Sequence, residues 1–332
     1  NKEKWHWHMP FDIQTGQSPA SGSSESYASI FAEYALKRAK TDPKFLVLMS
    51  AVPGLLGLTQ ERREELGKHY LDVGIAEETA VAMASGAAHA GAHVIWGSSA
   101  TFIQRTYDQL TQDLALNQNP AVIVGSGSIR GLMAATHQGL SSISMIANIP
   151  NMVYLAPSNA EEYIAMLDWA LDQDKHPVYI AIPSGPVVHA EGSVRTNFDN
   201  LNTYEVTREG SKVAVLALGD FYDLGEKTVE ALSSTLGIEA TLVKPYFASG
   251  VDQNLLDNLV KDHGVIVTIE DGIIEGSWGQ NIASYLGTSS ARVLNYGVKK
   301  AFYDRVNIAD LMRENHLDPE LIATDIKQVL GL

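Results

Sequence analysis

The chain has 332 residues, 45% hydrophobic and 19% charged, which is enough for two domains with substantial cores and argues against disorder. Its net charge of −15 and its lack of a basic run argue against a nucleic-acid or anionic-membrane partner. It contains no cysteine, which excludes disulfides, thiolate metal sites and a cysteine nucleophile.

Residues 1–25 are irregular and predict a linker segment. Their aromatic stretch at 5–11 precedes a Ser/Gly-rich run, which indicates a segment that docks on another part of a protein. His6 and His8 lack a third ligand nearby, so we predict no metal site. There is no apolar signal region or membrane-length apolar run, so we expect a cytoplasmic protein. The start at Asn1 indicates processing or a piece of a longer chain.

From residue 26 onward, helical patterns alternate with short, fully apolar strands. A first helix ends at Asp42-Pro43, and the strand at 45–49 is a continuous apolar run, as in a parallel sheet covered on both faces. The later predicted elements are helix 78–90, strand 93–96, helix 102–116, strand 121–124, strand 152–155, helix 159–171 and strand 178–182. This alternation predicts a doubly wound α/β domain over residues 26–186.

The segment 183–186, Pro-Ser-Gly-Pro, breaks the pattern, and the polar residues 187–210 predict a linker. A second doubly wound α/β domain is expected over 211–332. Its predicted elements are strand 213–218, helix 224–235, strand 240–243, helix 252–262, strand 265–269, helix 278–286, strand 292–295 and helix 318–331.

Three chemically distinctive residues follow predicted strands of the first domain: Glu77, Phe102 and His137. Taken singly, they fit a carboxylate at a helix N-terminus, a core aromatic residue and a solvated loop histidine. Carboxyl ends of parallel strands are, however, where α/β sheets bind ligands. Their convergence therefore predicts a site. A competing motif, the glycine-rich loop at 125–131, is disfavoured as a nicotinamide site because residues 132–150 contain no acid for a ribose.

Around these residues the sequence resembles the thiamine-diphosphate-dependent transketolase family, most closely its 1-deoxy-D-xylulose-5-phosphate synthase branch. The resemblance covers nearly the whole chain, as a pyrimidine-binding domain followed by a C-terminal domain. The motifs that carry it are Trp-His…Pro-Phe…Thr-Gly (5–16), Asp-Val-Gly-Ile-Ala-Glu (72–77), Thr-Phe-Ile-Gln-Arg-Thr-Tyr-Asp-Gln (101–109), Ala-Thr-His-Gln-Gly (135–139), Ile-Pro-Asn-Met-Val-Tyr-Leu-Ala-Pro-Ser (149–158) and Glu-Asp-Gly-Ile-Ile-Glu-Gly-Ser-Trp-Gly (270–279).

The resemblance implies roles for individual residues. Glu77 matches the carboxyl that hydrogen-bonds to the cofactor pyrimidine, and Phe102 matches the aromatic ring that stacks on it. His137 and His6 match histidines that act on the substrate. Arg105 matches an arginine near the cofactor, and Ile75 is expected as a further cofactor contact. The Mg²⁺ that accompanies thiamine diphosphate would be held by the family's diphosphate-binding domain, which the resemblance does not cover.

The chain departs from the synthase pattern where that branch binds a substrate phosphate. Ser126 and Ser184 stand at the positions of two phosphate-binding arginines. Arg130 is the nearby residue that could hold an anion in their place, so these three are expected to face the substrate. One arginine does not replace two bidentate clamps, which favours a less phosphorylated acceptor.

Two functions stay open. The first is transfer of a two-carbon unit by a synthase-like transferase, or by a split-transketolase subunit with a different acceptor. The second is a non-catalytic homologue. The resemblance implies a diphosphate-binding domain or subunit as partner, small-molecule substrates, and assembly as a homodimer or heterotetramer. We therefore expect the isolated chain to be inactive.

Overall fold

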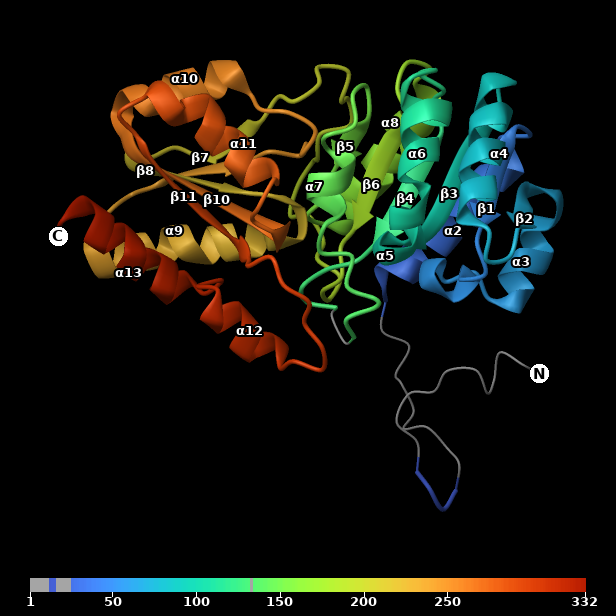
Figure 1. Ribbon diagram of the computed structural model, residues 1–332, viewed down its shortest axis with the longest axis horizontal. Coiled ribbons are helices and arrows are strands. Elements are labelled where there is room, and N and C mark those ends of the chain that lie inside the picture. The colour runs from blue at the N-terminus through green and yellow to red at the C-terminus, as the bar shows by residue number, and fades with distance from the viewer. Residues whose placement is uncertain (1–11, 16–24, 132–133) are drawn as a thin grey trace.

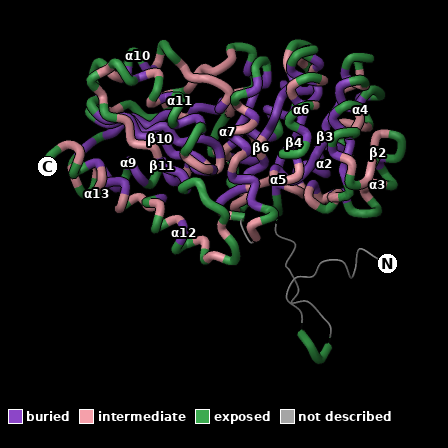
Figure 2. Tube along the Cα trace, viewed as in Figure 1, coloured by how far each residue is buried: buried purple, intermediate pink, exposed green. Residues whose placement is uncertain are grey.

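The computed structural model describes residues 12–15, 25–131 and 134–332 of the chain. His6 and most of the predicted linker 1–25 lie outside the described residues. Two α/β domains lie side by side, each with its own sheet (Figure 1). The two doubly wound domains expected from the sequence are thereby confirmed, and Figure 2 shows the strands of both sheets as mostly buried.

The first sheet has six strands, and every neighbouring pair in it is parallel. Its strands, in spatial order, are β2 (Tyr70–Asp72), β1 (Phe45–Met49), β3 (His93–Ser99), β4 (Val122–Ser126), β6 (Val178–Ile182) and β5 (Val153–Leu155). Successive residues of β1 point to opposite faces, and both faces are covered: Val47 packs in one apolar cluster and Leu48 in another. This two-sided burial explains why the strand sequences are continuously apolar.

Helices cover the two faces of the first sheet. On one face lie α2 (Tyr27–Thr41) and α8 (Ala160–Asp172). On the other lie α4 (Glu77–His89), α7 (Ser142–Ile146) and a helical run that comprises α5 (Ala100–Ile103), a 3-10 turn (Gln104–Thr106), α6 (Tyr107–Gln109) and a π-helical turn (Leu110–Ala115). The short helix α3 (Gln60–Leu66) precedes β2.

The second sheet has five strands, with only the edge strand β7 antiparallel to its neighbour. In spatial order they are β11 (Arg292–Val298), β10 (His263–Ile273), β8 (Lys212–Ala217), β9 (Thr241–Lys244) and β7 (Glu205–Arg208). The helices α9 (Tyr222–Leu236) and α13 (Pro319–Leu330) cover one face, while α10 (Gln253–Asp262) and α11 (Trp278–Tyr285) cover the other; α12 (Ile308–Glu314) precedes α13. As the sequence predicts, Asp318 caps α13 and Pro319 is its first residue.

Some elements were not predicted because they lack a clear apolar period. β7 lies inside the range 187–210 that the sequence assigns to a linker. None of its four residues is buried, so its sequence carries no alternation of apolar and polar residues. α3 is mostly charged, and Leu66 is its only buried residue. The continuous helix predicted over 102–116 is wrong in detail, since 3-10 and π turns interrupt it.

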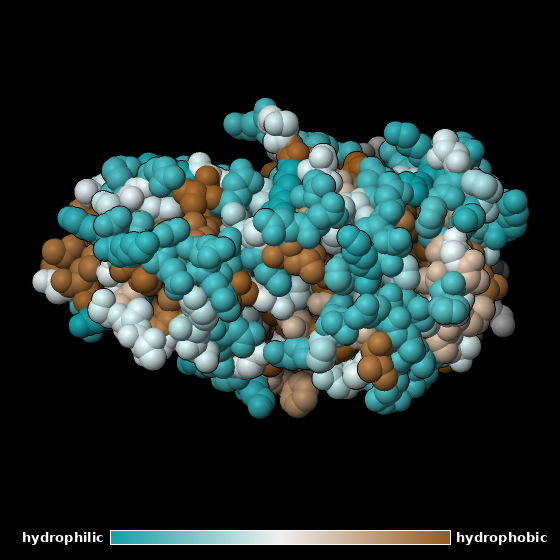
Figure 3. Space-filling view, turned by 90° about the horizontal axis from the view of Figure 1, so that it is seen from above, coloured by the Kyte–Doolittle hydropathy of each residue, from teal (hydrophilic) through white to brown (hydrophobic). Residues whose placement is uncertain are grey.

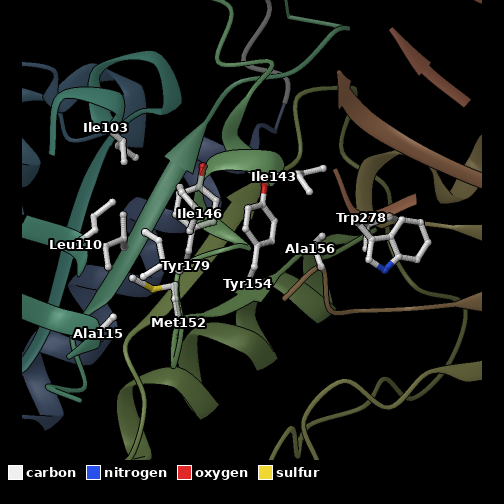
Figure 4. Packing of buried hydrophobic residues seen from close by; sticks show 14 of the residues in the cluster. Ile103, Leu110, Ala115, Ile143, Ile146, Met152, Tyr154, Ala156, Tyr179 and Trp278 are labelled. Carbon is white, nitrogen blue, oxygen red and sulfur yellow. The ribbon is translucent and has the colours of Figure 1, made fainter. Parts of the chain in front are cut away.

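The two domains share one apolar core at their junction. The cluster on the α4 side of the first sheet continues through Ile143, Tyr154 and Ala156 to Trp278 of the second domain (Figure 4). The backbone is also joined, because the Ala156 N–H donates to the Tyr246 carbonyl at 2.9 Å and the Ala248 N–H donates to the Tyr154 carbonyl at 3.0 Å. The domains are therefore packed together and not merely tethered.

The face in Figure 3 is mainly hydrophilic, with separated hydrophobic groups. None of the helices in the described part of the chain has the length and apolar character needed to cross a membrane.

Candidate functional site

Glu77 is the first residue of α4, at the carboxyl end of the short strand β2. Only 2% of the residue is exposed, although it is a carboxylate. The positive end of the helix dipole favours a negative charge at this place. The Glu77 side chain also pairs with Arg105, whose Nη1 donates to Glu77 Oε2 at 3.2 Å. Half of the arginine side chain stays exposed. A buried carboxylate is thus presented beside an accessible cation.

Phe102 and Arg105 are three residues apart where α5 passes into a 3-10 turn. Residues at this spacing project from nearly the same side of such a turn. The Phe102 ring meets the His137 ring edge to face, with the ring centroids 5.3 Å apart. The structure therefore brings Glu77, Phe102, Arg105 and His137 together through two pairwise contacts at one edge of the sheet.

His137 lies on an exposed loop between β4 and α7. Its Nδ1 hydrogen-bonds with Thr136 Oγ1 at 2.8 Å. The Thr136 carbonyl in turn accepts a hydrogen bond from Thr101 Oγ1 at 3.1 Å, next to Phe102. These bonds fix the loop against α5 and leave the imidazole open to solvent, where it can donate or accept a proton.

Ile75 lies in the turn between β2 and α4 and is 77% exposed. An isoleucine this exposed, two residues before Glu77, offers apolar contact to a molecule bound at this edge. Its role as a cofactor contact stays a prediction.

Ser126, Ser184 and Arg130 lie toward the domain junction. Ser126 ends β4, and the Ser184 N–H donates to Asp220 Oδ2 at 3.3 Å. Arg130 is already engaged: Nη1 donates to the Asp220 carbonyl at 2.8 Å and Nη2 to Asp223 Oδ1 at 2.6 Å. Its guanidinium also lies 4.5 Å from the centroid of the Phe221 ring. To bind a substrate anion, Arg130 would have to leave these partners.

Sequence reasoning missed the acids on the second-domain side of this junction. Asp271 Oδ1 accepts the Ile129 N–H at 2.7 Å, and Asp220 and Asp271 both line a small pocket with Gly127, Tyr154 and Ile182. Asp220 follows β8, and Asp271 lies near the end of β10. The rule that points to carboxyl ends of parallel strands, applied to the second domain, would have found both.

Two neighbouring acids of β10 have raised pKa values. Burial, followed by the charge of Asp220, raises the pKa of Asp271 to about 7. Burial also raises the pKa of Glu270 to about 7. Glu270 has a structural task, because its Oε1 accepts the Gly279 N–H at 2.9 Å and its Oε2 accepts the Ser277 hydroxyl at the start of α11. The Glu-Asp-Gly segment thus caps a helix and holds a loop of the first domain.

Asp271→Asn is expected to stabilise the chain increasingly as pH rises from about 4 to about 7. A carboxyl whose folded pKa is raised contributes its full stability below the unfolded pKa and loses it as pH rises through the folded pKa. Melting temperatures at pH 5 and pH 8 test this. The gain over wild type should be larger at pH 8, by about 1–2 °C for each kcal/mol of stability difference in a chain of this length. Asp262→Asn, at an exposed acid, is the control. An equal gain at both pH values would contradict the prediction.

No group of three or more His, Asp or Glu side chains suited to a metal ion occurs among residues 12–15, 25–131 and 134–332. The residues that are present suit a flat heterocycle: a buried carboxylate for a ring nitrogen, with an aromatic ring and an imidazole beside it. Their chemistry fits the pyrimidine half of thiamine diphosphate.

Two family models match the chain in sequence. The transketolase pyrimidine-binding domain matches residues 24–187, and the transketolase C-terminal domain matches residues 202–322. The 1-deoxy-D-xylulose-5-phosphate synthase of Clostridium perfringens (strain ATCC 13124) is 30% identical over 99% of this chain and 53% of its own length. The synthase of Pseudoalteromonas translucida is 32% identical over 98% of this chain and 52% of its own length. The chain thus spans about half the length of these relatives.

Solved structures share the fold at lower identity. A chain of a split-gene transketolase, described as an inactive β4 tetramer, has a TM-score of 0.76 at 20% identity and matches over 91% of this chain and 97% of its own. A Pichia stipitis transketolase in complex with sedoheptulose 7-phosphate has a TM-score of 0.75 at 17% identity, over 94% of this chain and 46% of its own. The chain belongs to the transketolase family, of which it contains the pyrimidine-binding and C-terminal domains.

Proposed function

We propose that this chain is one half of a thiamine-diphosphate-dependent transferase that moves a two-carbon unit from a ketose or 2-oxo acid to an aldehyde. The observation that supports it best is the pair of contacts Glu77–Arg105 and Phe102–His137 at one sheet edge. The match of residues 24–187 to the transketolase pyrimidine-binding domain and the similarity to the synthases support this assignment. These observations favour a cofactor ring as the ligand of the site.

The roles of the residues follow from their placement. Glu77 would hold a proton at its carboxyl against the pyrimidine ring, and Phe102 would stack on that ring. His137 would donate or accept a proton at the reacting oxygen of the substrate, since its ring is exposed on a fixed loop. Thiamine diphosphate, when bound, supplies the nucleophilic thiazolium carbon that attacks a carbonyl group.

We further propose that the diphosphate and its Mg²⁺ are held by a diphosphate-binding domain or subunit. That half would be either an upstream part of the same polypeptide or a separate chain. The structurally similar split-gene transketolase chain is described as a β4 tetramer, which supports an oligomeric assembly. For this chain we propose a homodimer or a heterotetramer with the diphosphate-binding half. A cytoplasmic location also stays a prediction.

A different acceptor is the second candidate. Ser126 and Ser184 offer hydroxyls, and the Arg130 guanidinium is already bound by Asp220 and Asp223 and is not free for a phosphate. A substrate with fewer phosphates than glyceraldehyde 3-phosphate fits this charge distribution better.

The test is reconstitution. The chain is purified with its diphosphate-binding half, and initial rates are measured with pyruvate as donor and with glyceraldehyde 3-phosphate or unphosphorylated glyceraldehyde as acceptor. Thiamine diphosphate binding is measured by calorimetry in the presence of Mg²⁺. We expect turnover from the mixture and none from this chain alone. Tight cofactor binding without turnover for any donor and acceptor would support a non-catalytic homologue, and robust activity of the isolated chain would contradict the need for a partner.

A further inference from the structure

The loop that carries His137 is held from two sides. On the side of its own domain, Thr101 Oγ1 donates to the Thr136 carbonyl. The loop also passes very close to α5, because a Cβ at Gly139 would lie 2.6 Å from the Cβ of Ala100. Only a residue without a Cβ fits this close approach, and the positive φ of 63° at Gly139 is a second feature that favours glycine.

The other side is formed by the second domain. Asp304 Oδ1 accepts the Ala135 N–H at 3.3 Å, two residues before His137. The Tyr303 N–H donates to Gln138 Oε1 at 3.4 Å, one residue after it. Further along, the Ile273 N–H donates to the Leu140 carbonyl at 3.0 Å. The second domain thus forms hydrogen bonds with the loop on both sides of His137.

Residues 299–305, the segment of the second domain that contacts the loop, are themselves held by hydrogen bonds. The Lys299 N–H donates to Asn315 Oδ1 at 3.1 Å, and the Tyr303 hydroxyl donates to the Lys299 carbonyl at 2.7 Å. Phe302 in the same segment is 93% exposed, so its side chain contributes no apolar anchor. The Lys299–Asn315 bond and the packing of Tyr303 against the apolar core of the second domain therefore fix this segment and present Asp304 and the Tyr303 N–H to the loop.

Gln138 is the loop residue next to His137 whose side chain the second domain contacts. It is 5% exposed, and its Nε2 is a buried atom with no hydrogen-bond partner. Burying an amide group without hydrogen bonds costs stability, and the bond that Gln138 Oε1 accepts from Tyr303 offsets part of that cost. The bond from the Tyr303 N–H thus orients the side chain that adjoins His137.

We infer that segment 299–305 of the C-terminal domain, through Asp304 and the Tyr303 N–H, positions His137 for its reaction. The inference rests on the proposed function, since it gives the C-terminal domain a task in that same site. Asp304 is a positioning residue, since it would act on His137 through the Ala135 N–H. Misplacing a reacting group by about 1 Å can cost about 100-fold in rate, so a loop held at several points is more effective than a free one.

The test compares Asp304→Ala with Asp304→Asn, which keeps an oxygen that can accept the Ala135 N–H. Asp262→Ala, at an exposed acid of α10 in the same domain, is the matched control. The first readout needs no cofactor: amide hydrogen exchange of residues 134–140 and the ring signals of His137, assigned with His137→Asn. We expect about 10-fold faster exchange and a broadened or shifted His137 signal in Asp304→Ala, with wild-type behaviour in Asp304→Asn and Asp262→Ala.

The second readout is activity after reconstitution with the diphosphate-binding half. We expect Asp304→Ala to lower kcat by about 10-fold or more with little change in KM, and Asp304→Asn to restore it. Gln138→Met removes the acceptor of the Tyr303 N–H without a large change of shape. It should also lower kcat with little change in KM.

Wild-type exchange and His137 signals in both Asp304→Ala and Gln138→Met would overturn the inference. Faster exchange with unchanged kcat would overturn it as well, because the loop would then be held for stability alone. If the exchange results are as expected but the wild-type mixture shows no turnover, the proposed function fails while the grip on the loop stands.

Discussion

Glu77→Gln is expected to lower transferase activity by at least about 100-fold once the diphosphate-binding half is supplied, which is the usual contribution of a positioned acid or base. Glutamine keeps the shape and the hydrogen-bonding oxygen of the side chain but exchanges no proton. The measurement is the initial rate at saturating thiamine diphosphate and Mg²⁺. Calorimetric titration with the cofactor shows whether binding or turnover is lost.

The matched control is Glu78→Gln, because Glu78 lies in the same first turn of α4 and is exposed. Both substitutions remove a negative charge from a helix N-terminus, at a cost of about 0.3–1 kcal/mol. The bond of Glu77 to Arg105 adds little, because half of the arginine side chain is exposed and solvent screens the pair. The two variants should therefore melt at similar temperatures and differ in activity. Equal activity of both variants would contradict the assignment of Glu77.

Lys244→Met is expected to cost about 3–5 kcal/mol of unfolding free energy, the usual cost of breaking a buried ion pair by removing one partner. Lys244 of β9 lies 2.6 Å from Glu162 Oε1 of α8, across the domain junction, and the two side chains are 13% and 2% exposed. The other carboxylate oxygen of Glu162 accepts the N–H and the hydroxyl of Ser158 at 2.8 and 2.9 Å. Without Lys244, this carboxylate would stay buried with its charge unpaired.

Denaturant unfolding measures this loss as a lower midpoint at an unchanged slope. Lys261→Met, at an exposed lysine of α10, is the control and should unfold within about 0.5 kcal/mol of wild type. The double variant Lys244→Met/Glu162→Gln should recover part of the loss, because no charge then stays buried without a partner. A wild-type midpoint for Lys244→Met would mean that the pair does not join the domains.

The first domain was predictable in outline because its signals are local. The strand at 45–49 is apolar at each position, and both of its faces are covered. The edge at which Glu77, Phe102 and His137 lie was also predictable, because parallel strands bring their carboxyl ends to one edge, although the short strand β2 before Glu77 was not itself predicted. In contrast, β7 was not predicted, since an edge strand without buried side chains has no apolar period to detect.

Partners that are distant along the chain were beyond prediction. Arg130 was expected at the substrate, but the structure pairs it with Asp223, 93 residues away, and stacks it on Phe221. The sequence placed a cation in the loop and could not say which of the many acids of the chain would neutralise it. An ionised side chain takes the partner that the packing of the domains brings within reach.

The sequence by itself determined the order of most helices and strands, the two-domain α/β architecture and the sheet edge expected for Glu77, Phe102 and His137. It could do so because periodicity, caps and apolar runs are properties of neighbouring residues. Only the tertiary structure decided that Lys244 joins Glu162, that Asp271 holds the loop at Ile129, and that Asp304 reaches Ala135 from 169 residues away. These contacts form because a shared apolar core packs the two domains against each other. The polar groups buried by that packing form hydrogen bonds and ion pairs across the junction.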